Sequence, residues 1–193
     1  MRGYFGIGIE QISKPMNAGA IFRTAHAFGA SFVFTVAATY PKRMGARADT
    51  SKTPGHVPFY SFPDLSSMLL PTDCTLVGIE LTDDAIELPS FHHPLQAAYI
   101  LGPERGSLSP EMTAKCDFTV KIPTAFCVNV GIAAAIVMYD RALAQSRFAP
   151  RPPRPGGPVE PAPTHVHGGP MFRAEAETFL DAAPLETVFQ DPD

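Results

Sequence analysis

The first 148 residues alternate short apolar runs with segments of helical periodicity, and this alternation restricts the fold more than any other feature. An alternation of strands and helices is typical of an α/β domain, so we expect a mostly parallel sheet flanked by helices. The apolar runs are short and rich in β-branched and aromatic residues, as strands are. The predicted strands are Tyr4–Glu10, Ser31–Ala37, Cys74–Glu80, Ala97–Leu101 and Phe118–Ile122.

Three segments are predicted to be helices. Asn17–Gly29 offers Asn17 as an N-cap, apolar residues at helical spacing and a glycine at its end. Pro63–Leu70 is expected to form a shorter helix. Cys127–Arg147 is the strongest prediction, because it has an almost continuous apolar face. The long polar segment Thr39–Pro58 has no regular pattern, which is usual for functional or mobile loops.

The composition changes abruptly at residue 149. Eight prolines fall between Pro150 and Pro170 without a periodic apolar pattern, which predicts an extended or disordered tail over residues 149–193. Charge follows the same division: residues 1–148 hold twelve Lys/Arg and twelve Asp/Glu, and residues 149–193 hold three and seven. The net charge of −4 therefore belongs to the tail and does not exclude a nucleic-acid partner for the body.

Composition also limits the class of protein. An apolar content of 45% and a charged content of 18% are ordinary for a soluble globular domain, and no apolar run is long enough to cross a bilayer. The N-terminus leads directly into a predicted strand without a signal-peptide pattern, so we expect a cytoplasmic location. Cys74, Cys116 and Cys127 are widely spaced and match no metal-ligand pattern, which predicts neither a disulfide framework nor a metal site.

The first segment with candidate chemistry is NAGAIFRTAHAF, residues Asn17–Phe28. Its single arginine, Arg23, stands among Ala, Ile and Phe, and a buried guanidinium requires an anionic or strongly polar partner. Two interpretations remain open. Arg23 is either a functional arginine or a side chain that reaches the surface or forms a structural ion pair.

Two further segments lie in the second half of the chain. In ILGPERGSLSP, residues Ile100–Pro110, a strand runs into a loop of small residues whose backbone groups can reach a ligand, although a purely structural turn is equally compatible. The loop has neither the dinucleotide fingerprint nor the phosphate-loop pattern. In Ile122–Asp140, a proline-containing loop precedes the apolar helix. Asn129 lies near the first turn of that helix, where it is either a site residue or a capping residue.

Taken together, in order and spacing, the three segments resemble the SpoU/TrmH family of SPOUT-class RNA methyltransferases. The resemblance covers residues 3–147. The first motif is matched by Asn17, Gly19, Ile21, Arg23, Thr24, Ala25, Phe28 and Gly29, the second by Leu101, Gly102, Glu104 and, after a shortened gap, Gly106, and the third by Ile122, Pro123, Asn129 and Ala133–Ala135.

This resemblance implies a SPOUT fold with a deep trefoil knot in its C-terminal half, where S-adenosylmethionine binds. It also implies a homodimer in which the arginine and the cofactor pocket meet across the subunit interface. Val128–Met138 suits such an interface, because it is hydrophobic nearly all round. The implied catalytic residues are Arg23, Asn17, Glu104 and Asn129, and the implied cofactor-binding residues are Leu101, Gly102, Gly106, Ile122, Pro123, Cys127 and Asn129.

One of these positions departs from the family pattern. Family members commonly carry serine where this chain has Cys127, and we interpret the cysteine as a tolerated replacement. A nucleophilic cysteine would need a nearby base, and no histidine is close in sequence. In the implied mechanism Arg23 stays charged, positions a phosphate and stabilises the negative charge that develops on a ribose 2′-hydroxyl.

A basic run follows the second predicted strand and comprises Lys42, Arg43, Arg47 and Lys52. It is either a solvated loop or a segment that binds RNA phosphates, and the methyltransferase motifs favour the second interpretation. His92 and His93 match no catalytic or metal pattern and are assigned to a surface turn.

The predicted function is S-adenosylmethionine-dependent ribose 2′-O-methylation of RNA. Transfer RNA is favoured over ribosomal RNA, because no RNA-binding domain precedes the first strand. The alternatives are a non-catalytic RNA-binding dimer of the same fold and an unrelated nucleotide-binding α/β enzyme.

Overall fold

The computed structural model describes residues 3–39, 55–146, 148–149, 151–152 and 155–157. Contacts between Cα atoms divide the chain into residues 1–147 and 148–193, and every element described below belongs to the first unit. The predicted tail falls almost wholly outside the described residues. Its disorder and the domain boundary at residue 148 therefore stay predictions.

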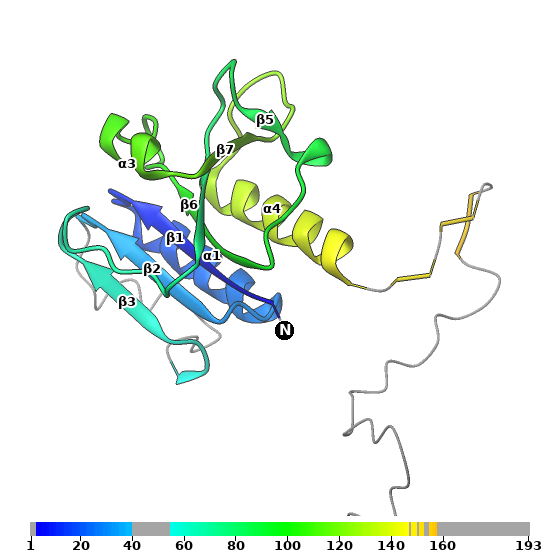
Figure 1. Ribbon diagram of the computed structural model, residues 1–193, viewed down its shortest axis with the longest axis horizontal. Coiled ribbons are helices and arrows are strands. Elements are labelled where there is room, and N and C mark those ends of the chain that lie inside the picture. Colours follow the sequence, from blue (N-terminus) through cyan, green and yellow to red (C-terminus); the bar gives the residue numbers. More distant parts are fainter. Residues whose placement is uncertain (1–2, 40–54, 147, 150, 153–154, 158–193) are drawn as a thin grey trace, which may run out of the picture. The chain divides into compact units, whose positions relative to one another are not determined.

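The described residues form a seven-stranded sheet in the order β3-β2-β1-β6-β4-β7-β5, and all neighbouring strands run parallel (Figure 1). The expected mostly parallel α/β sheet is therefore confirmed. The chain fills one side of β1 with β2 and β3 and the other side with later strands, so the strand order reverses between β1 and β6. The strands are β1 (Tyr4–Glu10), β2 (Phe32–Val36), β3 (Phe59–Phe62), β4 (Thr75–Ile79), β5 (Ile86–Glu87), β6 (Gln96–Leu101) and β7 (Phe118–Lys121).

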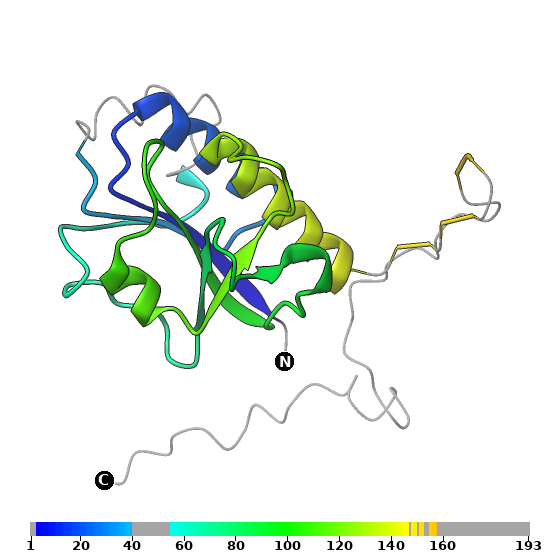
Figure 2. The ribbon, with the colours of Figure 1, turned by 90° about the horizontal axis from the view of Figure 1, so that it is seen from above.

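Helices cover both faces of this sheet. On one face α1 (Pro15–Ala27) and α4 (Val130–Gln145) pack against each other and against the larger hydrophobic core (Figure 2). On the other face α3 (Pro110–Lys115) and residues 65–70 cover a second cluster. A fully buried Val, Ile or Met side chain contributes roughly 1.5–3 kcal/mol, so these two clusters account for the attachment of the helices.

Strand β1, an inner strand of the sheet, carries glycines at alternate positions. Ile7 points into the core beneath α1 and α4, whereas Gly6 and Gly8 lie on the opposite face, directly under Phe32 and Phe34. A Cβ atom added at Gly8 would lie 2.4 Å from the Phe34 ring. The two glycines therefore leave the space that the aromatic rings of β2 occupy.

Helix α1 begins two residues earlier than predicted. Pro15 opens it, which suits a residue with a preset φ and no backbone N–H, and the capping residue Lys14 makes no side-chain cap. Asn17 therefore lies within the first turn, and its prediction as the N-cap was wrong. At the other end, Gly29 adopts φ +71° directly after the C-cap, so the predicted glycine stop is confirmed.

The predicted helix Pro63–Leu70 was also wrong, because this segment forms bends and turns. The Asp64 carboxylate accepts hydrogen bonds from the Ser67 backbone N–H at 2.8 Å and the Ser66 hydroxyl at 2.7 Å. Such local bonds compete with helical ones. Met68 is buried in the hydrophobic cluster on the face of the sheet that α3 covers, and this contact holds the segment against the sheet.

Several short elements were not predicted. They are β3 and β5 at the two edges of the sheet, the 3₁₀ helix η2 (Leu88–Ser90) and α3. The hydroxyl of Ser109 caps α3 by accepting a hydrogen bond from the Met112 N–H. Helix α4 begins at Val130, three residues later than predicted, with Asn129 as its N-cap. The unpredicted elements β3, β5, η2 and α3 are each too short, or too dependent on a neighbour, for their own residues to predict them.

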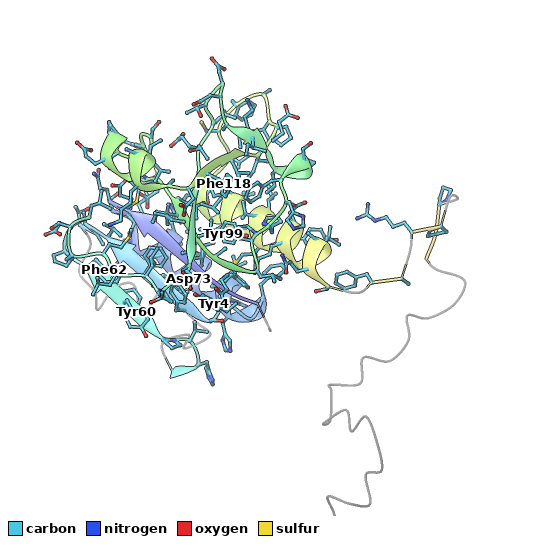
Figure 3. All side chains as sticks on the ribbon, in the orientation of Figure 1. Tyr4, Tyr60, Phe62, Asp73, Tyr99 and Phe118 are labelled. Atoms are coloured by element: carbon cyan, nitrogen blue, oxygen red, sulfur yellow. The ribbon has the colours of Figure 1, made fainter. Side chains whose placement is uncertain are left out.

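His93 is 1% exposed, so its assignment to a surface turn was wrong, although His92 is exposed. The hydroxyl of Tyr99, a residue of β6 that lies beside α4 (Figure 3), accepts a hydrogen bond from Arg141 at 3.1 Å. The Asp140 carboxylate can only accept, so His93 Nε2–H donates to it at 2.9 Å, and Nδ1 of the neutral ring accepts a hydrogen bond from the Tyr99 hydroxyl at 2.6 Å. Burial lowers the pKa of His93 against the opposing effect of Asp140, so the neutral ring is favoured.

No helix in the described part of the chain is long and apolar enough to cross a membrane. The trefoil knot that the family resemblance implies stays a prediction.

We expect the substitution Gly8→Ala to lower the free energy of unfolding by about 1–3 kcal/mol, because the fully buried Phe34 ring has no space into which to move. Urea denaturation followed by circular dichroism measures this difference. Gly55→Ala is the matched control, since a Cβ atom there meets nothing within 4 Å. Equal stability of the two variants would contradict the packing role of Gly8.

Candidate active site

A cavity of about 150 Å³ lies at the carboxyl edge of the sheet, beside the point where the strand order reverses. In α/β sheets this is where ligands bind, because the loops that follow neighbouring parallel strands diverge there. The cavity wall is formed by the segments that follow β4, β6 and β7 and by the first turns of α4. It comprises residues 79–81, 101–104, 106, 122, 124, 127–130 and 133.

Six of the seven predicted cofactor-binding residues belong to this wall. Pro123 does not, although its neighbours Ile122 and Thr124 do. The exposed Cys127 lines the cavity, and its role stays a prediction. The six residues are Leu101, Gly102, Gly106, Ile122, Cys127 and Asn129.

Sequence reasoning missed the part of the wall that β4 supplies. Ile79, Glu80 and Leu81 line the cavity at the end of this strand, which belongs to none of the three motifs. The only available signal was an acidic residue closing an apolar strand. The order of the strands places these residues at the cavity, because β4 lies next to β6 and the carboxyl ends of the two strands meet.

Glu104 connects the second motif to the start of α1. Its carboxylate accepts hydrogen bonds from the Lys14 N–H at 2.9 Å, the Ser13 N–H at 3.3 Å and the Ser13 hydroxyl at 3.0 Å. The Asn17 amide donates a fourth bond, at 3.1 Å. A negative charge at this point is also favoured by the dipole of α1. Glu104 therefore ties the loop after β6 to the helix that carries the first motif.

The hydrogen bonds outweigh the cost of partial burial at this carboxyl group. Desolvation raises the pKa of Glu104, but the bonds from Asn17, Lys14 and Ser13 lower it, and the net direction is downward. Glu104 is consequently charged throughout the neutral range.

Asn17 extends the same network to the third motif. Because its amide N–H₂ donates to Glu104, its carbonyl oxygen is left to face Asn129, whose amide nitrogen lies 3.5 Å away. This last contact is long and therefore weak. Asn129 also accepts a 2.9 Å hydrogen bond from the Gly131 N–H, so it is a capping residue as well as a cavity residue. One chain of contacts thus joins polar residues from all three motifs.

Two more carboxylates hold the far end of the loop after β6. Glu10, only 3% exposed, accepts hydrogen bonds from the Ser109 N–H at 2.8 Å and the Ser109 hydroxyl at 2.6 Å. Glu80 accepts one from the Leu108 N–H at 2.8 Å. The loop also folds back on Gly102, where an added Cβ atom would lie 2.9 Å from the Leu108 nitrogen. These contacts keep the loop in one conformation.

Arg23 is exposed on α1 and does not belong to the cavity wall of its own chain. Both interpretations of this residue, a functional arginine or a side chain that reaches the surface or forms a structural ion pair, are compatible with that exposure. The predicted RNA-binding residues Lys42, Arg43, Arg47 and Lys52 lie outside the described residues. Within the described part, no group of three or more His, Cys, Asp or Glu side chains could hold a metal ion.

Residues 5–139 match the SpoU rRNA methylase family, which is more than half of the 193-residue chain. The chain belongs to this family. The match includes all three motifs and every element that forms the cavity wall, so the family's sequence pattern and the cavity coincide.

Two relatives of this SpoU family member act on different RNAs. The tRNA (guanosine(18)-2'-O)-methyltransferase of Escherichia coli K12 is 27% identical over 140 residues, covering 68% of this chain and 60% of the relative. The 23S rRNA (guanosine-2'-O-)-methyltransferase RlmB of Acinetobacter baylyi is 27% identical over 146 residues, covering 69% and 57%. The chain thus spans less than two thirds of the length of these relatives.

Solved structures share the fold of this SpoU family member. The SpoU methyltransferase AviRb from Streptomyces viridochromogenes, in complex with AdoMet, aligns with a TM-score of 0.67 and 22% identity, covering 76% of this chain and 60% of AviRb. An AdoMet-bound rRNA methyltransferase from Sinorhizobium meliloti aligns with a TM-score of 0.67 and 18% identity, covering 76% and 59%.

We expect Glu104→Gln to lower the free energy of unfolding by about 0.5–1 kcal/mol at pH 7, a small effect because solvent screens this partly exposed group. The folded pKa is depressed below the ordinary value of 4.5, so the stabilisation is present above that value. It is lost as the pH falls through the lowered pKa. The difference between the urea midpoints of the two proteins should therefore be smaller at pH 3 than at pH 7.

Glu87→Gln, at an exposed position on β5, is the control for the loss of one negative charge. A constant difference between wild type and Glu104→Gln at both pH values would contradict the role of the Glu104 charge.

Proposed function

We propose that this protein transfers a methyl group from S-adenosylmethionine to a ribose 2′-hydroxyl of RNA. The observation that carries the proposal is the contact chain Glu104–Asn17–Asn129, which joins the three SpoU motifs beside a cavity at the carboxyl edge of the sheet. Membership of the family and the two 2'-O-methyltransferase relatives support the reaction type. AviRb, which has the same fold, binds AdoMet, and this supports the cofactor.

The cavity wall suits S-adenosylmethionine chemically. Leu101, Ile122 and Ala133 present apolar surface for an aromatic base, while the loop at Gly102 brings backbone groups close to a ligand. Glu80 and Glu104 give the wall negative charge, which suits a cofactor that carries positive charge. When bound, the cofactor supplies an electrophilic methyl group on a sulfonium. The role of the chain is to bind it, orient it and exclude water around it.

Arg23 is the residue that we propose for contact with RNA at the reacting centre. A guanidinium is charged at every physiological pH, so it can hold a phosphate and stabilise negative charge developing on the ribose oxygen without acting as a base. Glu104, Asn17 and Asn129 would keep the start of α1 and the start of α4 in fixed positions around that centre. Because Arg23 is exposed in its own chain, we propose that it serves the cavity of a second subunit.

The surface of α1 and α4 supports such a homodimer. Met16 on α1 is 79% exposed, and Ile132 and Tyr139 on α4 are each 54% exposed. Apolar side chains gathered on two adjacent helices are a common feature of subunit interfaces. A two-fold arrangement uses the same patch on both subunits, so the outward face of α1 that carries Arg23 would face the partner.

The substrate that we propose to test first is transfer RNA, as for the Escherichia coli relative, with ribosomal RNA as the second candidate after the Acinetobacter relative. The basic run Lys42–Lys52 would contact phosphates, which makes RNA binding strongly dependent on salt. A cytoplasmic location belongs to the same proposal.

Mass spectrometry of nucleosides from separated transfer and ribosomal RNA tests the function. We expect one 2′-O-methylated nucleoside to be present in cells with the gene and absent in cells without it. Cells carrying Arg23→Ala should lack it too, while the purified variant still binds S-adenosylmethionine. Lys115→Ala, exposed at the end of α3, is the control and should keep the modification.

Unchanged modification in Arg23→Ala cells would contradict the role of Arg23. RNA binding by a wild-type protein that binds no S-adenosylmethionine in calorimetry would instead favour the non-catalytic RNA-binding dimer.

The dimer is tested separately by light scattering after size-exclusion chromatography. We expect Ile132→Asp to convert the dimer to a monomer, because the carboxylate would be buried without a partner at the interface. Leu69→Asp is the control, since Leu69 is 79% exposed but lies on neither helix. A wild-type monomer, or a dimer unaffected by Ile132→Asp, would overturn this interface.

A further inference from the structure

The cavity wall is negatively charged. Two carboxylates, Glu80 and Glu104, line it, and no Lys, Arg or His does so among the described residues. Arg105 is exposed in the loop after β6 and lies outside the wall. Lys121 directs its ammonium group to the carbonyl oxygens of Thr82 and Asp83 at 3.1 and 3.0 Å.

The two carboxylates differ in how far protein groups occupy them. Glu104 accepts four hydrogen bonds from Ser13, Lys14 and Asn17, and a carboxylate has about four acceptor positions. Glu80 accepts only two described bonds, from the Leu81 N–H at 3.0 Å and the Leu108 N–H at 2.8 Å. Glu80 is therefore the carboxylate of the wall that keeps acceptor capacity and charge for a ligand.

The charge of the ligand changes during methyl transfer. In S-adenosylmethionine the sulfonium and ammonium groups outweigh one carboxylate, so its net charge is +1. When the methyl group passes to the ribose oxygen, a C–O bond forms and the S–C bond breaks. The sulfur keeps the electron pair as a neutral thioether, and the hydroxyl proton leaves to solvent. The product S-adenosylhomocysteine has a net charge of zero.

We propose that Glu80 is a specificity-determining residue that makes the site bind the cationic methyl donor in preference to its neutral product. This inference rests on the proposed function, because it takes S-adenosylmethionine as the ligand. For a sulfonium bound in this cavity, a carboxylate of the wall at the effective dielectric of a partly buried site would change the ratio of the two affinities on the order of tenfold. The loss of this attraction after transfer also favours release of the product.

Isothermal titration calorimetry of the full chain with three ligands tests the proposal. S-adenosylmethionine and sinefungin are cationic at the reacting position, because sinefungin carries an amine there, and S-adenosylhomocysteine is neutral. We expect wild type to bind both cationic ligands on the order of tenfold more tightly than the neutral one. Glu80→Gln should remove most of this preference, and Glu80→Asp, which keeps the charge, should retain it.

Glu10→Gln is the matched control. Glu10 holds Ser109 of the same loop through its carboxylate but does not line the cavity. We expect this variant to weaken all three ligands equally if it weakens any of them, which separates an effect on loop position from an effect of charge on the ligand. Circular dichroism verifies that each variant is folded.

The inference is overturned if wild type binds the three ligands equally. This measurement uses wild-type protein alone and does not depend on the folding of any variant. It is also overturned if Glu80→Gln keeps the preference, or if Glu10→Gln loses it to the same extent. Wild-type binding without preference contradicts this inference alone. A complete absence of binding by all three ligands contradicts the proposed function as well.

Discussion

The hydrogen bonds that the Glu104 carboxylate accepts are the interaction on which the rest of the site depends. They tie the loop after β6 to residues 13–17, a connection between segments about ninety positions apart in the chain. Through Asn17 the same connection reaches Asn129 and the start of α4. The bonds use charge rather than apolar contact, so they can hold the start of α1 at a cavity that must remain accessible to ligand and solvent.

The parallel sheet makes this arrangement possible. Because β1, β4 and β6 end at one edge, three glutamates gather there: Glu10 at the end of β1, Glu80 directly after β4 and Glu104 in the loop after β6. Each accepts backbone N–H bonds, which compensates for the cost of placing a carboxylate at least partly inside the protein. All three carboxylates hold the loop after β6, and two of them, Glu80 and Glu104, also make the cavity wall negatively charged.

The parts of the fold that follow from local chemistry could be predicted. The apolar runs predicted β1, β2, β4, β6 and β7 to within one residue at each end, and Gly29 predicted the end of α1. Pro63–Leu70 was misread because Asp64 forms local bonds that compete with a helix, and Asn17 was misread because Pro15 starts α1 earlier. The burial of His93 depends on Tyr99 and on Asp140, which is 47 positions away, so no local pattern could reveal it.

The sequence by itself determined the family, and six of the seven residues that it predicted to bind cofactor line the cavity. These residues could be predicted because they lie within short motifs whose order and spacing are visible along the chain. Only the tertiary structure decided that Glu80 belongs to the cavity and that Arg23 faces outward. Both facts depend on which strands are neighbours and which face of α1 packs on the sheet. The positions of Glu80 and Arg23 depend on contacts between segments far apart in the chain, and the local periodicity of the sequence does not predict such contacts.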